Sequence, residues 1–157
     1  MDIAARLESC LQDEQAAVLA FRALLEQESG VLTSRHTFGD LQALSERKQR
    51  FAEQLGALGA RRDVLLAELG LPAGHDGMRQ AAADYPAVGA VWEALLAQCA
   101  DAASLNERNG ALVALHLRHA DEALDALRTL LPDASGLYSA SGRSRGPGSN
   151  RTSIVAR

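Results

Sequence analysis

The sequence predicts an all-α protein, an elongated antiparallel helical bundle or coiled coil of three long helices with a flexible C-terminal tail. Composition is the first reason, because 30 Ala and 25 Leu stand against 7 Val and 2 Ile, and small and straight-chain residues favour helix over strand. The second reason is that apolar residues recur every three or four positions in three long stretches. We expect a helical rod over 1–132 and a flexible basic tail over 133–157.

The first helix is expected over about 2–32. Its apolar residues are mostly three, four or seven positions apart, so they lie along one seam of the helix. They are Ala4, Leu7, Leu11, Val18, Phe21, Leu25 and Leu32. Glu14 and Glu28 interrupt this seam.

The second helix is expected over about 38–70, with Gly70 and Pro72 marking its end. Steps of three and four alternate along it, which is the a/d ladder of a coiled coil. The ladder is Leu41, Leu44, Lys48, Phe51, Leu55, Leu58, Arg62, Leu65 and Leu69. For Lys48 and Arg62 two interpretations are open. Either their stems pack while their charged ends reach water, or they pair with glutamates of the first helix and set the register of the bundle.

A break follows at 71–86, within which 78–84 could form a short helix, and the third helix is expected over about 87–131. Its apolar stripe is Val88, Trp92, Leu95, Cys99, Ala102, Asn106, Asn109, Val113, Leu117, Ala120, Leu124, Leu127 and Leu131. We prefer one continuous helix, although Asn109-Gly110 could break it and give a four-helix bundle. The third helix exceeds the other two in length, so apolar surface is left for a partner or for self-association.

Asn106 and Asn109 are polar residues within that stripe. They could hydrogen-bond across the bundle and set its register, as a buried asparagine does in a coiled coil. They could instead mark the point at which the bundle gives way to a partner-binding groove. The oligomeric state stays open, since both a monomer and a dimer through the exposed stripe fit the pattern.

Charge and hydropathy limit the partners and the compartment. The net charge is −4, but four arginines and no acidic residue follow Asp133, so this tail carries +4 and the rest −8. An acidic body binds phosphates poorly, so we expect no nucleic-acid partner. The tail is expected to be a solvated end, although it could touch an acidic surface. Without a signal peptide or a run of about 18 apolar residues, the protein is expected to be cytoplasmic and not stably inserted in a membrane.

The side chains that carry chemistry are few. Cys10 and Cys99 stand at apolar helical positions and are expected to be buried rather than disulfide-bonded. No histidine follows a glutamate by three residues, so the di-iron pattern of helical bundles is missing. Neither a glycine-rich phosphate loop nor a nucleophile in a known catalytic context occurs. We therefore expect no enzyme, no metal and no cofactor.

Several of these residues together resemble FlgN-like flagellar type III secretion chaperones. Glu28 closes the first helix, Lys48 and Arg62 are regularly placed in the second, and Leu65-Leu66 leads to Leu69-Gly70. Asn106-Glu107-Arg108-Asn109-Gly110 opens the second half of the last helix, and a tyrosine segment, Tyr138 to Arg143, ends in Gly-Arg. Ser139 stands where that family usually has glycine.

The resemblance implies a cytosolic chaperone of the hook–filament junction proteins FlgK and FlgL. Such chaperones hold the helical terminal segment of a subunit and present it to the flagellar export gate. The partner-binding groove is then expected at Leu117, Ala120, Leu124, Leu127 and Leu131, with Leu137 and Tyr138 as a second anchor. Tyr138 could instead pack back onto the rod. The alternatives are a general coiled-coil adaptor and an export chaperone for another flagellar client.

Overall fold

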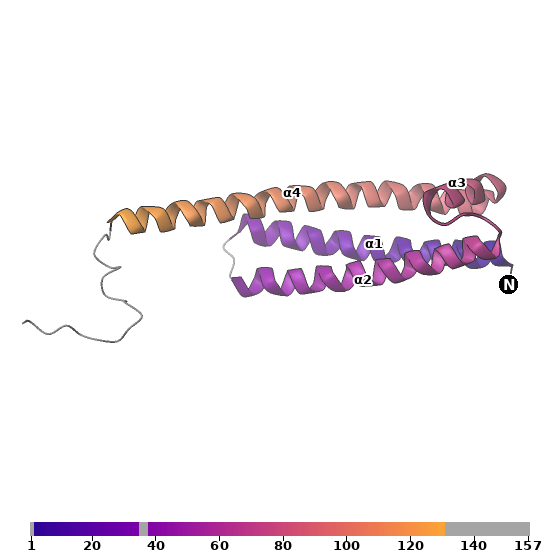
Figure 1. Ribbon diagram of the computed structural model, residues 1–157, viewed down its shortest axis with the longest axis horizontal. Helices are drawn as coiled ribbons and strands as arrows, with labels where there is room; N and C mark the ends of the chain where they lie inside the picture. The colour runs from indigo at the N-terminus through magenta and orange to yellow at the C-terminus, as the bar shows by residue number, and fades with distance from the viewer. Residues whose placement is uncertain (1, 35–37, 131–157) are drawn as a thin grey trace, which may run out of the picture. The chain divides into compact units, whose positions relative to one another are not determined.

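The computed structural model describes residues 2–34 and 38–130, and the regular structure in these ranges is helical throughout. Four helices follow one another: α1 (Ile3–Thr33), α2 (Phe38–Glu68), α3 (Gly74–Asp84) and α4 (Pro86–Leu130) (Figure 1). The predicted all-α class is confirmed for these residues, which contain no strand. The three long helices have the predicted bounds to within two residues. The short helix begins at Gly74 instead of residue 78.

Helix α4 continues through Asn109 and Gly110, so the alternative of a break at this point is wrong. The chain divides into two compact units, Met1–Leu117 and Arg118–Arg157. The first unit contains α1, α2, α3 and most of α4. The described part of the second unit is the end of α4, from Arg118 to Leu130. The predicted tail, 133–157, lies outside the described residues.

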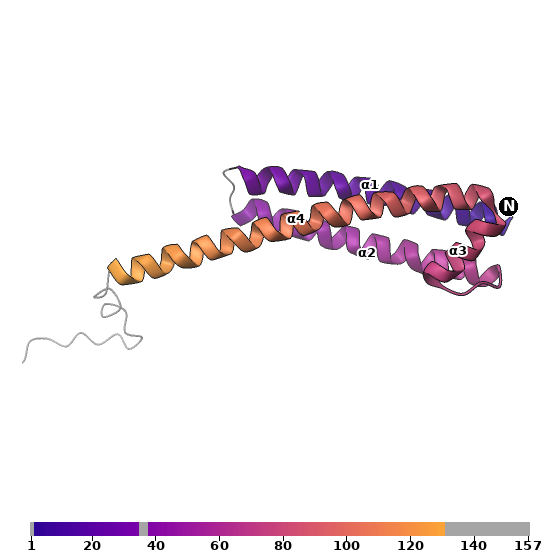
Figure 2. The same ribbon diagram turned by 90° about the horizontal axis from the view of Figure 1, so that it is seen from above.

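Contacts between side chains give the directions of the helices in the first unit. Low-numbered residues of α1 pair with high-numbered residues of α2, so these two helices are antiparallel, and Figures 1 and 2 show them side by side. The ion pairs in this order are Arg6–Glu68, Asp13–Arg61 and Glu28–Lys48. Helix α4 runs parallel to α1, because Asn109 bonds to Leu25 while His116, one heptad later, bonds to Leu32.

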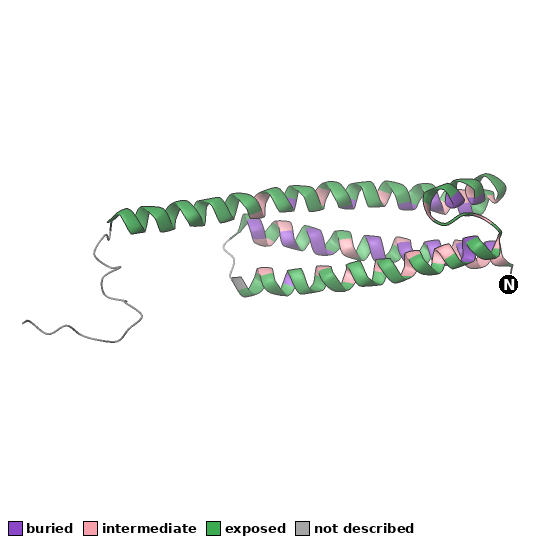
Figure 3. Ribbon diagram, in the orientation of Figure 1, coloured by how far each residue is buried: buried purple, intermediate pink, exposed green. Residues whose placement is uncertain are grey.

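The core of the first unit lies between α1, α2 and the first part of α4, and α3 adds Met78 and Ala81 at one end. The predicted seam of α1 is confirmed, since every position is buried except Phe21, which is half-buried and packs on Phe51 with ring centroids 5.8 Å apart. Figure 3 shows the buried positions along α1 and the exposed ones over the last turns of α4. The ladder positions of α2 are all buried or half-buried.

One core prediction is wrong: Cys10 is buried, but Cys99 is exposed. The stripe of α4 consists of two rows with seven-residue spacing. The row Leu95, Ala102 and Asn109 is buried. The second row contains Trp92 and Cys99 and lies at the edge of the core. The large ring of Trp92 reaches the core from this row, but the short side chain of Cys99 does not.

Helix α2 ends in a glycine turn that connects it to α3. Gly70 has a φ of 74°, a left-handed conformation that favours glycine. The N–H of Leu71 donates to the carbonyl of Leu66 at 2.9 Å and that of Gly70 to the carbonyl of Ala67 at 2.9 Å, the two bonds of a Schellman motif. None of the helices over residues 2–34 and 38–130 has the length and apolarity needed to cross a membrane.

Candidate functional site

A first polar layer crosses the core of the first unit. Arg62 of α2 donates from Nη1 to Oε2 of Glu14 on α1 at 2.5 Å, and its guanidinium carbon lies 5.6 Å from the ring centroid of Trp92 on α4. Glu14 is only 6% exposed. Burial raises the pKa of its carboxyl group, the positive charge of Arg62 opposes this, and the carboxylate of Asp63 adds to it.

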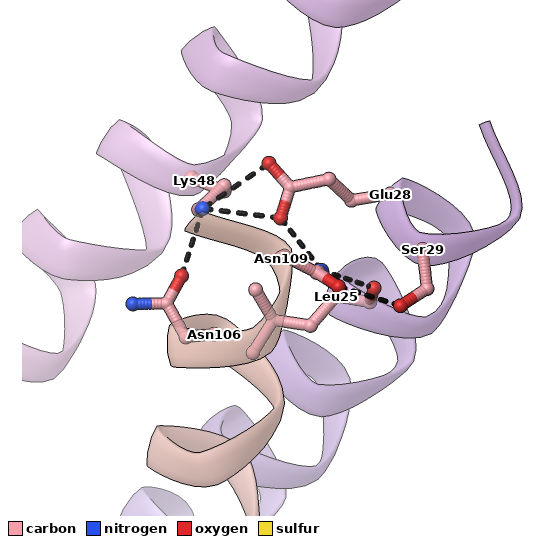
Figure 4. Close-up of polar contacts among 6 residues, drawn as sticks. All are labelled: Leu25, Glu28, Ser29, Lys48, Asn106 and Asn109. Atoms are coloured by element: carbon pink, nitrogen blue, oxygen red, sulfur yellow. Dashed lines mark hydrogen bonds and ion pairs between the residues drawn. The ribbon is translucent and has the colours of Figure 1, made fainter. Parts of the chain in front are cut away.

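A second polar layer has the same construction. Lys48 of α2 donates from Nζ to the two carboxylate oxygens of Glu28 on α1, at 3.2 and 3.1 Å, and to Oδ1 of Asn106 on α4 at 2.8 Å (Figure 4). Of the two interpretations of Lys48 and Arg62, pairing with glutamates of the first helix is therefore the one observed, and the structure assigns Lys48 to Glu28 and Arg62 to Glu14. The role of these residues in setting the register stays a prediction.

Asn109, which lies in the buried row of α4, forms further hydrogen bonds with the second polar layer and with its neighbours on α1. Its Nδ2 donates to the carbonyl oxygen of Leu25 at 2.8 Å and to Oε2 of Glu28 at 2.9 Å, and its Oδ1 accepts from Oγ of Ser29 at 2.5 Å (Figure 4). Asn109 is 1% exposed, whereas Asn106 is exposed at the edge of the bundle. The two asparagines, which the sequence pattern places alike, therefore have different environments.

The two layers repeat at a fixed spacing. Fourteen residues, or two heptads, separate the corresponding positions in each helix: Glu14 and Glu28 in α1, Lys48 and Arg62 in α2, Trp92 and Asn106 in α4. Each layer joins a glutamate of α1 to a cation of α2 and is completed by a side chain of α4. In the arrangement that the structure has, the polar groups of both layers are paired at the same time, which is compatible with the prediction that these residues set the register.

The predicted partner-binding residues of α4 lie on an exposed apolar face, called here the apolar stripe: Leu117, Ala120, Leu124 and Leu127. All four are exposed, with Leu124 at 52% and Leu127 at 53%. Ala120, Leu124 and Leu127 belong to the second unit and Leu117 is the last residue of the first. Leu131, Leu137 and Tyr138 lie outside the described residues.

Leu130 was missed by the sequence reasoning although it is 76% exposed. At 100° per residue it lies beside Leu127 at the edge of the apolar stripe, so a full helical projection could have found it. Ser29, which is half-buried, was also missed, and no sequence signal distinguishes it from other serines on a helix.

Other chemistry is sparse in the part of the chain that the structure describes. No group of three or more His, Cys, Asp or Glu side chains there is placed to hold a metal ion. A polar cavity of about 430 Å³ lies between α1 and α4. It is lined by Arg22, Glu26, Ser29, Asp101, Ser104, Leu105 and Arg108, so both signs of charge face it.

Comparison with known proteins bears on the family to which the chain belongs. No curated protein and no solved structure shows a significant match to the chain. A family model described as FlgN protein matches residues 1–146, a range that includes both polar layers and the apolar stripe. The chain therefore belongs to the FlgN family, a family of flagellar export chaperones.

Proposed function

We propose that this protein is a cytoplasmic chaperone that binds the helical terminal segments of the hook–filament junction proteins FlgK and FlgL. It prevents their premature assembly and delivers them to the type III export gate. Membership of the FlgN family supports the general role. The apolar stripe is the observation that carries the assignment of the binding site.

The apolar stripe suits an amphipathic client helix. Such a helix hides its own apolar face by laying it against another apolar helical surface. Leu124, Leu127 and Leu130 each expose more than half of their surface in the described chain, and contiguous exposed leucines of this kind mark binding surfaces. The opposite side of the same turns carries Arg118, Glu122 and Asp125, which keep that side in water.

Replacing both Leu124 and Leu127 by Asp tests the assignment. A client helix would then bury two unpaired carboxylates, each costing several kcal/mol, so binding by calorimetry should fall by at least about 100-fold. Helicity by circular dichroism should be retained, because both side chains face solvent in the free protein. Unchanged client affinity would refute the assignment.

A matched control lies on the opposite side of the same turns. Ala126→Asp with Thr129→Asp adds the same net charge at two exposed positions, away from Leu124 and Leu127 by helical geometry. This control should keep client affinity within about twofold. Equal losses in the control and the stripe variant would point to a general charge effect.

The role of Leu137 and Tyr138 as a second anchor is proposed separately. A Tyr side chain supplies the large apolar area typical of interface hot spots. Deletion of 133–157 should weaken client binding or docking on the export gate. If both survive the deletion, the tail has no part in either step.

Client identity is tested by co-purification. FlgK and FlgL should be retained on the immobilised protein, while the filament-cap protein and flagellin serve as comparison clients. Retention of the filament-cap protein instead would favour a related export chaperone with a different client.

A further inference from the structure

The two polar layers bury their glutamates equally but hydrogen-bond them unequally. The side chain of Glu14 is 8% exposed and that of Glu28 is 9% exposed. Both carboxylate oxygens of Glu28 accept from Lys48, and Oε2 also accepts from Asn109. Glu14 accepts at Oε2 from Arg62, while Oε1 of Glu14 and Nε of Arg62 are buried without a hydrogen-bond partner in the described ranges. The burial of the carboxylate is therefore compensated less completely in the first layer.

Incomplete compensation gives an ionised Glu14 two ways to lower its free energy. It can take up a proton, or the layer can open locally and return the carboxylate to water. Burial raises the pKa of the Glu14 carboxyl group, the charge of Arg62 opposes this rise and that of Asp63 adds to it. In a locally open state the carboxyl group is hydrated and its pKa returns towards the ordinary value. The closed layer therefore binds the proton more tightly than the open one, so the closed state gains stability as pH falls.

The hydrogen bonds of the layer indicate where the proton goes. Oε2 of Glu14 already accepts from Nη1 of Arg62 at 2.5 Å, whereas Oε1 has no partner among the described residues. A proton taken from water onto Oε1 removes the negative charge and leaves the bond to Arg62 in place. Arg62 then keeps its position 5.6 Å from the ring centroid of Trp92. The neutral form of the layer therefore retains its contacts among α1, α2 and α4.

Other titratable and charged groups surround the first layer on all four helices. Asp13 pairs with Arg61 at 3.2 Å, and both side chains are more than half exposed, so water compensates their charges. Burial raises the pKa of the thiols of Cys10 and Cys99, and the charge of Glu14 adds to this rise, so both thiols stay neutral below pH 7. The remaining groups are Arg62 and Asp63 of α2, and His75 of α3, whose ring centroid lies 5.7 Å from that of Trp92. Because histidines titrate between about pH 5 and 8, Glu14 has to be changed without changing His75.

We infer that the first polar layer is a pH-sensitive switch, which opens locally while Glu14 is ionised and closes when Glu14 takes up a proton. The second layer, in which both oxygens of Glu28 are bonded, stays closed in both conditions. The switch acts within the first unit and does not depend on client binding, so it goes beyond the proposed function. At neutral pH, the end of the bundle that carries Glu14, Arg62 and Trp92 is the part that opens most readily.

Native-state hydrogen exchange, followed by mass spectrometry at about pH 7 and at about pH 4.5, the ordinary pKa of a glutamate, tests the switch. Protection factors are corrected for the intrinsic pH dependence of exchange. They are compared between segments 7–18 and 58–66 around the first layer and segments 25–32 and 44–51 around the second. Glu14→Gln keeps the shape of the side chain without a titratable proton and leaves every other titratable group in place. Circular dichroism checks that this variant is folded.

In the wild type, protection of the first-layer segments should rise at least about threefold on acidification, relative both to Glu14→Gln and to the second-layer segments. The reason is that each unit by which the pKa of the closed state exceeds that of the open state changes the opening constant about tenfold. An equal rise in Glu14→Gln would overturn the inference, because another group, such as His75, would then be responsible. An equal rise around both layers would overturn it as well, because the whole first unit would then respond. Should Glu14→Gln fail to fold, His75→Gln decides instead: the rise has to persist in this variant, and its loss would overturn the inference.

Discussion

Replacing Asn109 by Ala should destabilise the first unit strongly, although the sequence pattern ranks this residue with Asn106. Asn109 is 1% exposed and makes hydrogen bonds to the carbonyl of Leu25, the carboxylate of Glu28 and the hydroxyl of Ser29. The substitution removes all three at once and leaves a small void in the buried row of α4.

The magnitude follows from the partners. The hydrogen bond to the charged Glu28 contributes about 1.5–3 kcal/mol and each neutral one about 0.5–1.5 kcal/mol. Glu28 keeps its ion pair with Lys48, and Ala is the better helix former by about 0.5 kcal/mol. We therefore expect the free energy of unfolding to fall by about 2–5.5 kcal/mol.

Asn106→Ala is the matched control. Asn106 is exposed and accepts one hydrogen bond, from Lys48, which water can replace, so the loss should stay below about 1 kcal/mol. Urea unfolding of both variants, followed by circular dichroism at pH 7, gives the comparison. Losses that agree within about 0.5 kcal/mol would refute the distinction drawn between the two asparagines.

Three further outcomes are expected for variants in the first unit. Gly77→Ala should lower the free energy of unfolding by about 1–3 kcal/mol, because a Cβ at this position would overlap the carbonyl oxygen of Pro72. Gly110→Ala should raise it by about 0.5–1 kcal/mol, because the added Cβ meets open space in α4 and Ala is the better helix former. Effects of the same sign in urea unfolding would contradict this. Glu14→Gln tests the raised pKa of Glu14. Because that pKa is higher in the folded protein than in the unfolded chain, the folded wild type binds the proton more tightly. The free energy of unfolding of the wild type, measured relative to that of Glu14→Gln, should therefore rise as pH falls from 7 towards 4.5. A stability difference that does not change with pH would show that the pKa of Glu14 is not raised.

The apolar periodicity was sufficient to predict the long helices, because each is amphipathic over many turns. It predicted the seam of α1 almost residue by residue, including the two glutamates that interrupt it. A charged residue at a seam position has few ways to be satisfied, so the ion pairs with Lys48 and Arg62 could also be suggested before the structure was known.

Apolar periodicity could not predict which positions of the α4 stripe are the most buried. Cys99, Asn106 and Asn109 all fit the spacing, but only Asn109 lies in the row that is buried. Which row is buried depends on how α4 is rotated against α1 and α2, and that rotation comes from tertiary packing. The sequence pattern also predicted too late a start for the short helix. The backbone N–H of Gly74 donates to Oδ1 of Asp63 on α2 at 2.9 Å, and such a contact between helices cannot be seen in local spacing.

The position of Trp92 determines what optical spectroscopy can report about this chaperone. It is the single tryptophan of the chain, and it lies on the guanidinium of Arg62 within the first polar layer. Its emission therefore monitors the integrity of the three-helix packing, and a client that contacts only Leu124 and Leu127 should leave it unchanged. A spectral shift on adding a tryptophan-free client would mean that client binding changes the packing around Trp92 in the first unit.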